Sequence, residues 1–442
     1  MQQLTYIVSG TADAQRKAEL TKEKLERIPH VESLLITIAA PCEMPLEKAL
    51  RMRDDVRDIF PEARILVHTC ALKMADMRLD TDGIMLTFTA LEASTAEFFL
   101  VDGNTSDTAT QEAFVRFVGQ RPHTKLIQFF VVGLMDQIDN LFEGFSAVDE
   151  RIQVFGAFVD AGPMNAHGYI VADDAATRLG MLAIVFHGET LETHTVRNFG
   201  WNSLGREIVA TRVDGCTIKE LDGDMPLRIY ERYFGIKGDG EFSADAALFP
   251  LCFEEEDGSI SARVPIKIEE GSGELTFGIP MEQGTKFRLA YGDPYGILSK
   301  AAENTREMTA FAPQAIFGTA CVGHYLLLGD DVVSEMTPCS GFPSSAVYVY
   351  GEVRRVGRRI STAHLNVLLV GMKEDTDYVK DIELKTKRVA HLSYNRKMLA
   401  FMSHFIRVSE EELFTANQRL SHLASRDALT NLLNRREMER LL

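Results

Sequence analysis

The amino-acid sequence predicts mixed sheets with flanking helices, of the α/β and α+β classes, followed by a long C-terminal coiled-coil helix. Three observations carry this prediction. Strand-like and helix-like patterns alternate over residues 1–145, strand patterns with Gly and Asp turns follow as far as residue 371, and a heptad repeat occupies the C-terminal region. A chain of 442 residues exceeds one ordinary hydrophobic core, so two or three domains are expected.

The first region predicts a mostly parallel sheet covered by helices. Amphipathic helices are expected over residues 12–27, 46–60, 105–119 and 136–145. Strands are expected over residues 4–8, 34–38, 64–68, 84–88, 98–101 and 126–132. Farther along, residues 181–186 and 192–199 are predicted to pair as a hairpin around His187-Gly188. No internal repeat is obvious in the sequence.

The second region begins after a short predicted helix over residues 226–234 and a stretch rich in Gly, Asp and Ala over residues 235–246. A further helix is predicted to start near Pro294. Strands are expected over residues 248–254, 260–268, 274–279, 286–291, 314–319, 346–353 and 364–371. This half therefore predicts an α+β arrangement.

The C-terminal region carries a heptad repeat without Pro or Gly from residue 373 to residue 442. Its a positions are apolar: Leu392, Leu399, Ile406, Leu413 and Leu420. Its d positions are weaker and partly polar: Asn395, Met402, Ser409, Ala416 and Leu423. Such a pattern fits either an amphipathic helix packed on the body or a parallel coiled coil that joins two protomers, and the regular a positions favour the coil. Self-association into a dimer is therefore expected.

The composition narrows the class of partner. A net charge of −17 argues against nucleic-acid binding and against attraction to an anionic membrane surface. No run of apolar residues is long enough to span a membrane, and no signal peptide is recognisable, so we expect a cytoplasmic protein. The six scattered cysteines show no metal-binding spacing and are expected to be buried, reduced thiols.

Two groups of motifs resemble the FIST domain. Three segments resemble the N-terminal half of the family: Phe199-Gly200-Trp201-Asn202-Ser203-Leu204-Gly205, Asp214-Gly215-Cys216-Thr217-Ile218-Lys219-Glu220-Leu221-Asp222-Gly223, and Pro226 to Tyr230. Val154-Phe155-Gly156-Ala157 resembles its Gly-Gly-rich strand and turn, with Ala157 in place of the second Gly. Three further segments resemble the C-terminal half: Tyr348-Val349-Tyr350-Gly351-Glu352-Val353, His364-Leu365-Asn366 and Cys321-Val322-Gly323-His324. At the position of His324 the family often has Arg. The resemblance spans about residues 30–371. It implies a sensory domain for small ligands, and some members of the family are haem-binding nitric oxide sensors.

The closing residues resemble a second family. The run Asp427-Ala428-Leu429-Thr430-Asn431-Leu432-Leu433-Asn434-Arg435-Arg436 is similar to the opening of the GGDEF domain of diguanylate cyclases. In that family the residue matching Asn434 helps to hold the guanine base. No Gly-Gly-Asp/Glu-Glu-Phe run follows, so no cyclase activity is expected from this chain. The implied division is a FIST N-terminal domain over 1–235, a FIST C-terminal domain over 246–372, a helical linker over 373–426 and the GGDEF start over 427–442.

Several residue types within these motifs suit a ligand site. Trp201, the one tryptophan, could close over a ligand or cap the core of a sheet. Glu352 could bind a ligand amine or cap a neighbouring turn. His364 and Asn366 alternate with apolar residues, which predicts that both side chains point to one sheet face. The candidate ligand-binding residues are Gly156, Trp201, Cys321, Tyr350, Glu352, His364 and Asn366.

The combined prediction is an intracellular small-ligand sensor of bacterial-type signalling that regulates a diguanylate cyclase output and hence cyclic di-GMP. The ligand could be amino acid-like. Alternatives are a protein-interaction module without a small ligand and a haem-binding gas sensor, for which His167, His187 and His194 are among the histidines available. An enzyme is a third alternative, but no familiar catalytic motif occurs, and no catalytic or metal-binding residue is assigned.

Overall fold

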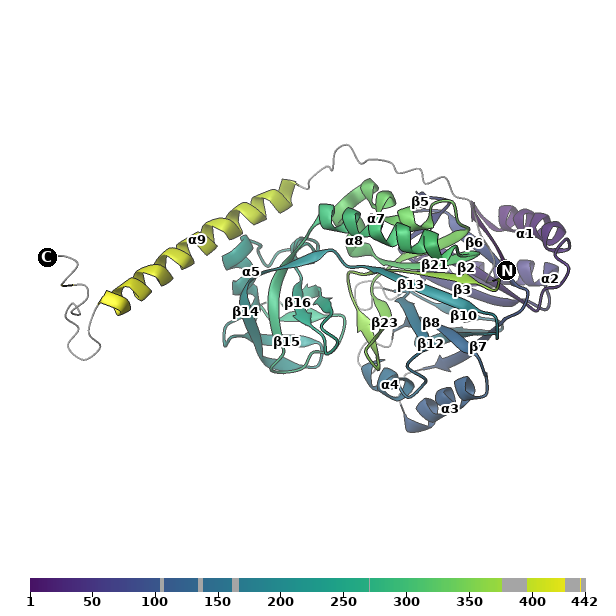
Figure 1. Ribbon diagram of the computed structural model, residues 1–442, viewed down its shortest axis with the longest axis horizontal. Coiled ribbons are helices and arrows are strands. Elements are labelled where there is room, and N and C mark those ends of the chain that lie inside the picture. Colours follow the sequence, from purple (N-terminus) through teal and green to yellow (C-terminus); the bar gives the residue numbers. More distant parts are fainter. Residues whose placement is uncertain are drawn as a thin grey trace.

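The computed structural model describes residues 1–103, 107–133, 138–160, 167–269, 271–375, 396–425 and 438. Figure 1 shows a layered body, a smaller unit of strands beside it, and helix α9 extending from that unit toward the C-terminus. The predicted coil positions Leu392 and Asn395 and the GGDEF-like run from Asp427 to Arg436 lie outside the described residues.

The described body contains the same chain pattern three times: an edge strand, a helix, a parallel strand pair joined by helix, a hairpin and a returning strand. The first repeat is β1 (Gln2–Val8), α1 (Thr11–Leu25), β2 (Ser33–Pro41), α2 (Leu46–Ile59), β3 (Arg64–Cys70), β4 (Leu72–Ala75), β5 (Arg78–Asp80) and β6 (Ile84–Leu91). The second is β7 (Thr95–Asp102), α3 (Thr108–Gly119), β8 (Thr124–Val132), α4 (Ile138–Phe145), β9 (Gln153–Phe158), β10 (Ile170–Ala172), β11 (Ala175–Thr177) and β12 (Gly180–His187). The third is β13 (Glu192–Asn198), α7 (Pro294–Phe311), β21 (Ala315–Cys321), α8 (Val322–Leu328), the 3-10 helix η2 (Gly329–Cys339), β22 (Ser344–Val349), β23 (Glu352–Val356), β24 (Arg359–Ala363) and β25 (Val367–Lys373).

Each repeat gives its hairpin to the sheet of another repeat. The strand orders are β1-β6-β2-β3-β10-β11, β7-β12-β8-β9-β23-β24 and β13-β25-β21-β22-β4-β5. The hairpin of the first repeat thus completes the third sheet, that of the second completes the first, and that of the third completes the second. The three sheets are therefore cyclically interlocked.

The interlocking corrects two expectations. Only β2/β3, β8/β9 and β21/β22 are parallel in these sheets, because the donated hairpin and the returning strand both run antiparallel to their neighbours. The prediction of a mostly parallel sheet was wrong. The hairpin expected around His187-Gly188 is also absent, because β12 pairs with β7 and β8 while β13 pairs with β25. That turn links two sheets instead of two neighbouring strands.

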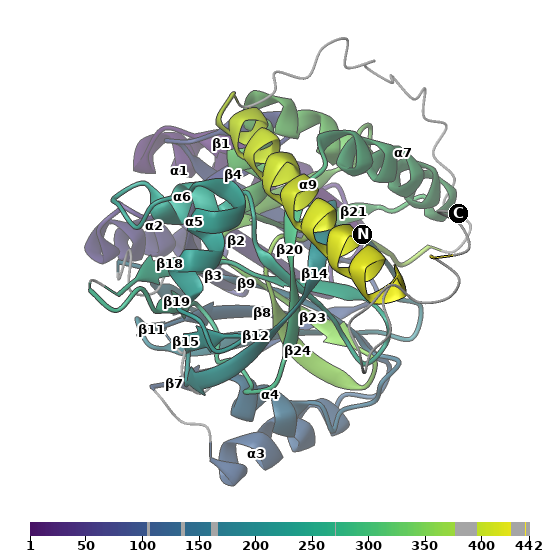
Figure 2. The same cartoon turned by 90° about the vertical axis from the view of Figure 1, so that its left-hand side faces the viewer.

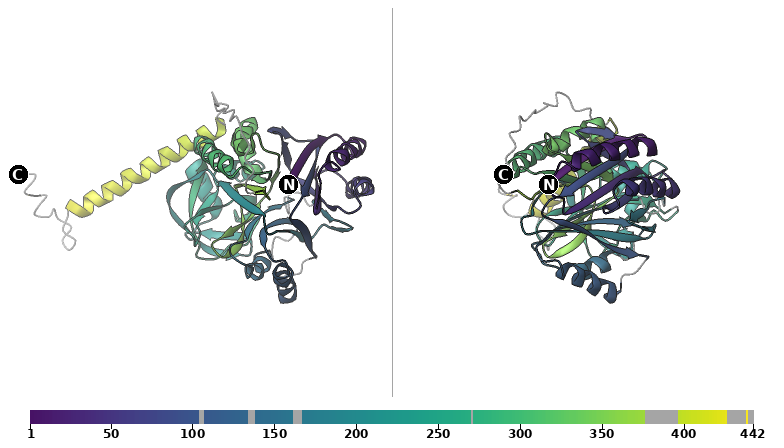
Figure 3. Two further views of the ribbon diagram at one scale, coloured as in Figure 1. Left: turned by 45° about the vertical axis from the view of Figure 1, so that its right-hand side comes forward. Right: turned by 90° about the vertical axis from the view of Figure 1, so that its right-hand side faces the viewer.

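One apolar core lies between the inner faces of all three sheets. Leu66 of β3, Phe155 of β9 and Val349 of β22 belong to this central core and are fully buried. The outer faces of the first two sheets are covered by α1 with α2 and by α3 with α4, which Figure 3 shows on separate sides. The predicted helices of the first region and the helix over 226–234 are confirmed to within a turn.

A fourth unit is inserted between β13 and α7. It consists of β14 (Trp201–Asp214), β15 (Thr217–Leu221), α5 (Pro226–Phe234), α6 (Phe242–Ala247), β16 (Leu251–Glu254), β17 (Ile260–Arg263), β18 (Pro265–Ile268), β19 (Leu275–Phe277) and β20 (Lys286–Gly292). Its seven strands form one sheet of antiparallel neighbours in the order β17-β16-β20-β14-β15-β19-β18. This unit and the third repeat together form the α+β half that the sequence predicts.

Helix α9 (Arg396–Ser425) packs against α5 of the inserted unit (Figure 2). The packed face carries the buried Met398 and Phe405. The apolar a positions point away from this contact: Leu399, Ile406, Leu413 and Leu420 are 53–63% exposed. A coiled coil is not shown, since one chain is described. Among the described helices, none is long and apolar enough to cross a membrane.

Gly156 provides a test of the packing in the second sheet. A Cβ at this position would lie 2.5 Å from the backbone oxygen of Phe129. Because backbone cannot move aside easily, Gly156→Ala should lower the free energy of unfolding by about 1–3 kcal/mol, measured by urea denaturation. Gly119→Ala is the matched control, since nothing lies within 4 Å of its added Cβ. Equal stability of the two variants would contradict this close approach.

Candidate functional site

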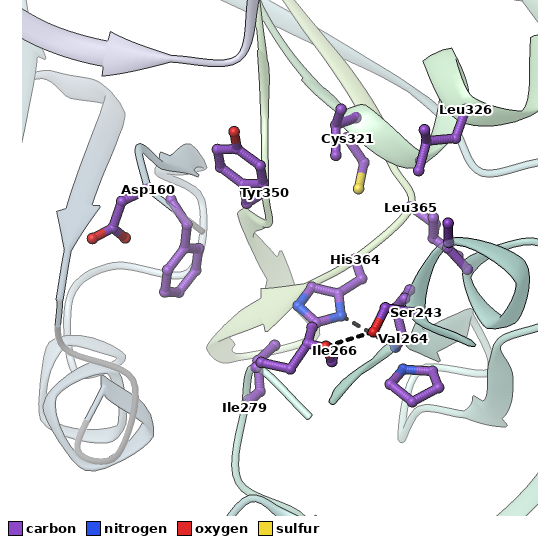
Figure 4. A pocket seen from close by; sticks show the side chains of 17 residues that line it. Asp160, Ser243, Val264, Ile266, Ile279, Cys321, Leu326, Tyr350, His364 and Leu365 are labelled. Carbon is purple, nitrogen blue, oxygen red and sulfur yellow. Dashed lines mark hydrogen bonds between the residues drawn. The ribbon is translucent and has the colours of Figure 1, made fainter. Parts of the chain in front are cut away.

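The candidate site is a cavity of about 360 Å³. It lies where the hairpin of the third repeat joins the second sheet. It is lined by Phe158, Asp160, Ser243, Ala244, Ala247, Val264, Pro265, Ile266, Gly278, Ile279, Cys321, Val322, Gly323, Leu326, Tyr350, His364 and Leu365. These residues come from the ends of β9, β21 and β22, from helix α8, from the segment before β25, and from the inserted unit, which covers the cavity. Figure 4 shows them around the opening.

The chain reaches this cavity through a break between β22 and β23. The sequence predicts one strand over residues 346–353, but Tyr350 and Gly351 interrupt it. A Cβ on Gly351 would lie 3.2 Å from the side chains of both His364 and Phe158. A glycine therefore lets the two aromatic rings close on the crossing backbone, and this close contact helps to shape the cavity wall.

His364 is a neutral hydrogen-bond donor at the cavity. The backbone N–H of Val264 donates to its Nδ1 over 3.4 Å, so the ring proton belongs on Nε2. Burial, assisted by the charge of Arg263, lowers the pKa of His364 to about 3. The ring is therefore uncharged at neutral pH. It can donate one hydrogen bond from Nε2 to a ligand atom.

Three other polar groups on the cavity wall, those of Cys321, Tyr350 and Ser243, have little reactivity of their own. Burial raises the pKa of the Cys321 thiol well above its ordinary value, and the charge of Glu352 raises it further. A protonated thiol is a poor nucleophile. The Tyr350 hydroxyl lies 4.0 Å from the Cys42 thiol, and the Ser243 hydroxyl donates to the Ile266 carbonyl over 2.8 Å. These groups can therefore form weak hydrogen bonds with a ligand, but they are not suited to covalent chemistry.

Glu352 and Asn366 lie behind the cavity. The Asn366 backbone N–H donates to Glu352 Oε2 over 3.0 Å, while Glu352 Oε1 has no hydrogen-bond partner among the described residues. Arg197 of β13 donates from Nε to Asn366 Oδ1 over 2.5 Å. These contacts fix the segment that carries His364, so both residues support the site instead of lining it.

His324 holds the same segment from the other side. It donates from Nδ1 to Glu335 over 2.9 Å and from Nε2 to the Leu365 carbonyl over 3.0 Å. Burial lowers its pKa, but the Glu335 carboxylate and the Leu365 carbonyl, helped by Glu352, together outweigh burial, so the net pKa is raised. Leu365, with φ of 61°, is thereby held in a left-handed conformation that a leucine rarely adopts.

The positions of the predicted site residues can now be stated. Cys321, Tyr350 and His364 line the cavity, and Glu352 and Asn366 lie behind it. The expected alternation of His364 and Asn366 on one strand was wrong, because β25 begins only at Val367. Both belong to the irregular segment between β24 and β25, in which Leu365 adopts a positive φ of 61°.

Three other candidates lie apart from the lining. Gly156 pairs with Val353 between β9 and β23, where its missing side chain allows close packing. Trp201 is buried in the core of the inserted unit, 4.8 Å from the His324 ring and nearly perpendicular to it, and lines a different hollow. This placement favours the interpretation that Trp201 caps the core. Asn434 lies outside the described residues.

Sequence reasoning missed the parts of the lining that come from the inserted unit. Ser243, Val264 and Ile266 belong to short elements with no motif, and only the fold brings them to the cavity. Asp160 could have been found, because it closely follows the buried strand β9, and ligands often bind at the carboxyl ends of parallel strands.

The cavity does not fit haem. A haem iron needs an imidazole nitrogen with a free lone pair, and its ligand normally donates its other N–H to an acceptor. His364 shows the opposite arrangement, because its Nδ1 accepts from Val264. His167, His187 and His194 do not line the cavity. The described residues also contain no cluster of three side chains that could hold a metal ion.

A largely apolar cavity with a few directed polar groups is typical of proteins that bind small ligands. Comparison with known families agrees with this class. Residues 34–224 match the FIST N domain and residues 226–355 match the FIST C domain. The chain therefore belongs to the FIST family, whose domains are sensors of small ligands in signal transduction. No curated protein matches the chain.

Glu352 predicts a pH dependence of stability. Burial raises the pKa of Glu352 to about 8 from 4.5, despite the opposing hydrogen bond from Asn366. The folded chain therefore keeps a proton that the unfolded chain releases, and stability falls as pH rises between these values, by up to about 1.4 kcal/mol per pH unit.

Glu352→Gln should remove this dependence, because the amide stays neutral and still accepts from Asn366. Urea denaturation at pH 5, 6.5 and 8 should show the variant gaining stability relative to the wild type as pH rises. Exposed Glu189→Gln serves as the control and should give no such trend. If the free energy of unfolding changes with pH in the same way in the wild type and in Glu352→Gln, a buried, protonated Glu352 is ruled out.

Proposed function

We propose that this protein is an intracellular sensor that binds a small ligand in the cavity and passes the signal to helix α9. The observation that carries the proposal is the composition of the cavity wall. Phe158 and Asp160 come from the FIST N region, while Cys321, Tyr350 and the α6 residues come from the FIST C region. A ligand that contacts both regions would favour the arrangement in which both reach it.

A direct route leads from the cavity to α9. Ser243, Ala244 and Ala247 of α6 line the cavity. The other side of the same segment packs on α5, where the rings of Phe249 and Phe234 stack with centroids 4.1 Å apart. A shift of α6 would therefore displace the contacts that this segment makes with α5.

Aromatic rings continue this contact to α9. The centroid of Phe401 lies 5.8 Å from that of Phe249, and the centroid of Phe405 lies 5.7 Å from that of Phe234. Arg232 and Tyr233 of α5 also bond Glu412 of α9, at 2.5 and 3.1 Å. Packed aromatic contacts transmit small displacements, since close-packed interiors resist compression.

The proposed output follows from the sequence beyond α9. The run from Asp427 to Arg436 resembles the start of a GGDEF domain, so we propose control of a diguanylate cyclase. Such a cyclase joins two GTP molecules across a dimer, and a helix that sets the spacing of two copies would control it. The exposed a positions of α9 provide the surface on which a second copy would pack.

Blocking the cavity tests the sensor proposal. Ala244 is an exposed residue that lines the cavity, so Ala244→Trp should fill the opening without disturbing the core. In a thermal-shift screen of amino acids, amines and small aromatic molecules, a true ligand should raise the melting temperature of the wild type and not that of the variant. The same ligand should slow amide hydrogen exchange in α6 and α9 of the wild type.

Ala302→Trp on the exposed face of α7 is the matched control and should keep the full response. A ligand that stabilises Ala244→Trp as strongly as the wild type would place its site elsewhere. No response to any small molecule, together with capture of a defined protein partner, would favour the alternative of an interaction module.

The exposed a positions predict self-association. Leu413→Glu introduces charge into the apolar stripe, and we expect the full chain to become monomeric in analytical ultracentrifugation at concentrations where the wild type is dimeric. Gln418→Glu adds the same charge at an exposed position outside the a and d positions and should leave the dimer intact. A monomeric wild type at tens of micromolar would refute this part of the proposal.

A further inference from the structure

We infer that the cavity selects its ligand by charge, accepting a compact apolar molecule that is neutral or cationic and rejecting one that carries a carboxylate or phosphate. This inference rests on the proposed function, because it names the class of ligand for the same cavity. It separates amines and neutral aromatic molecules from free amino acids, which keep a carboxylate at neutral pH. Three features of the described residues support it.

The first feature is the apolar wall. Phe158 and Ile279 lie on it, as do Val264 and Ile266 from the inserted unit and Leu365 from the segment before β25. Most of a bound ligand would therefore contact hydrocarbon. Burial of apolar area would supply the binding free energy, at about 25 cal/mol per Å² removed from water. A charged group in such surroundings is costly unless it meets a partner.

The second feature is the lack of a cationic partner in the lining. Among the 17 described residues that line the cavity, none is Lys or Arg. The nearby Arg263 is buried and faces a neighbouring cleft, where it donates to the Ala262 carbonyl and lies 4.8 Å from the centroid of the Phe253 ring. His364 is neutral and offers one donor. An anionic group entering this cavity would therefore lose its hydration without gaining an ion pair.

The third feature is the carboxyl group of Asp160. It lies on the same side of the cavity as Tyr350, and Figure 4 shows Leu326 on the opposite side. The Asp160 residue is 5% exposed, and its charge contributes to the raised pKa of the Cys42 thiol. In its ionised form, this carboxyl group repels a ligand carboxylate and attracts an ammonium group. Meanwhile, Nε2–H of His364 can donate to a neutral acceptor.

A set of related probes tests the charge rule on the full chain. Indole is neutral, tryptamine is cationic, indole-3-acetate is anionic and tryptophan is zwitterionic, and all four share one ring system. By isothermal titration calorimetry at pH 7, indole or tryptamine should bind about tenfold or more tightly than indole-3-acetate and tryptophan, and Ala244→Trp should abolish that binding.

A lysine placed at the rim provides an independent test. Leu326 is 45% exposed on the cavity wall, so Leu326→Lys adds a cation without removing core packing. The variant should bind indole-3-acetate about tenfold more tightly than the wild type does, while tryptamine binding weakens. Leu326→Met keeps the wall apolar and should behave like the wild type.

The outcomes separate this inference from the function on which it rests. If indole-3-acetate or tryptophan binds the wild-type cavity as tightly as tryptamine, the charge rule is wrong while the sensor proposal stands. If none of the four probes binds the wild type and Leu326→Lys gains no affinity for indole-3-acetate, the inferred selection by charge is also wrong. The sensor proposal itself fails only if no ligand in the wider screen depends on an open cavity.

Discussion

The structure depends on the exchange of β-hairpins among three repeats. Each sheet of the body is completed by two strands from another repeat, so the three inner faces are held around one apolar core. The cavity follows from this exchange. Where the chain leaves β22 to enter the second sheet as β23, the crossing separates the ends of β9, β21 and β22, and the inserted unit closes the space above them. A site built on such a crossing must respond to the relative placement of the repeats.

Buried polar groups stabilise this crossing at a cost. Glu352, Asn366 and Arg197 form one chain of hydrogen bonds, and His324 and Glu335 form an ion pair on the other side of the same segment. Buried ion pairs seldom add much net stability, because desolvation offsets their attraction. Their value here is conformational: they hold Leu365 in a left-handed conformation and aim His364 at the cavity. The raised pKa of Glu352 and the unpartnered oxygen atoms show that this local order is achieved at the expense of stability.

The sequence predicts the elements of this fold better than their partners. Amphipathic helices such as α2 and α5 are visible because their periodicity and entering prolines are local signals. Strand pairing is not local, and nothing in residues 72–75 indicates that they pair with residues 345–348. The motif around Tyr350 to Glu352 identifies the crossing as special, yet the break at Gly351 depends on the ring of His364 and on that of Phe158, which lies far away in sequence. For the same reason Ser243 and Val264 could not be recognised, since they reach the cavity only through the fold.

The cyclic exchange also has a consequence for how the chain acquires its structure. Strand β4 of the first repeat finds its neighbour β22 only after most of the body has been synthesised. During that delay the first hairpin has no sheet to join, and the third sheet stays incomplete. Contacts between distant segments slow folding, and exposed strand edges invite aggregation, so nascent chains would need protection by chaperones. Once closed, the ring of exchanged hairpins would make unfolding slow as well, because a repeat that leaves must withdraw its own hairpin from the sheet of one neighbour and lose the hairpin that it receives from the other.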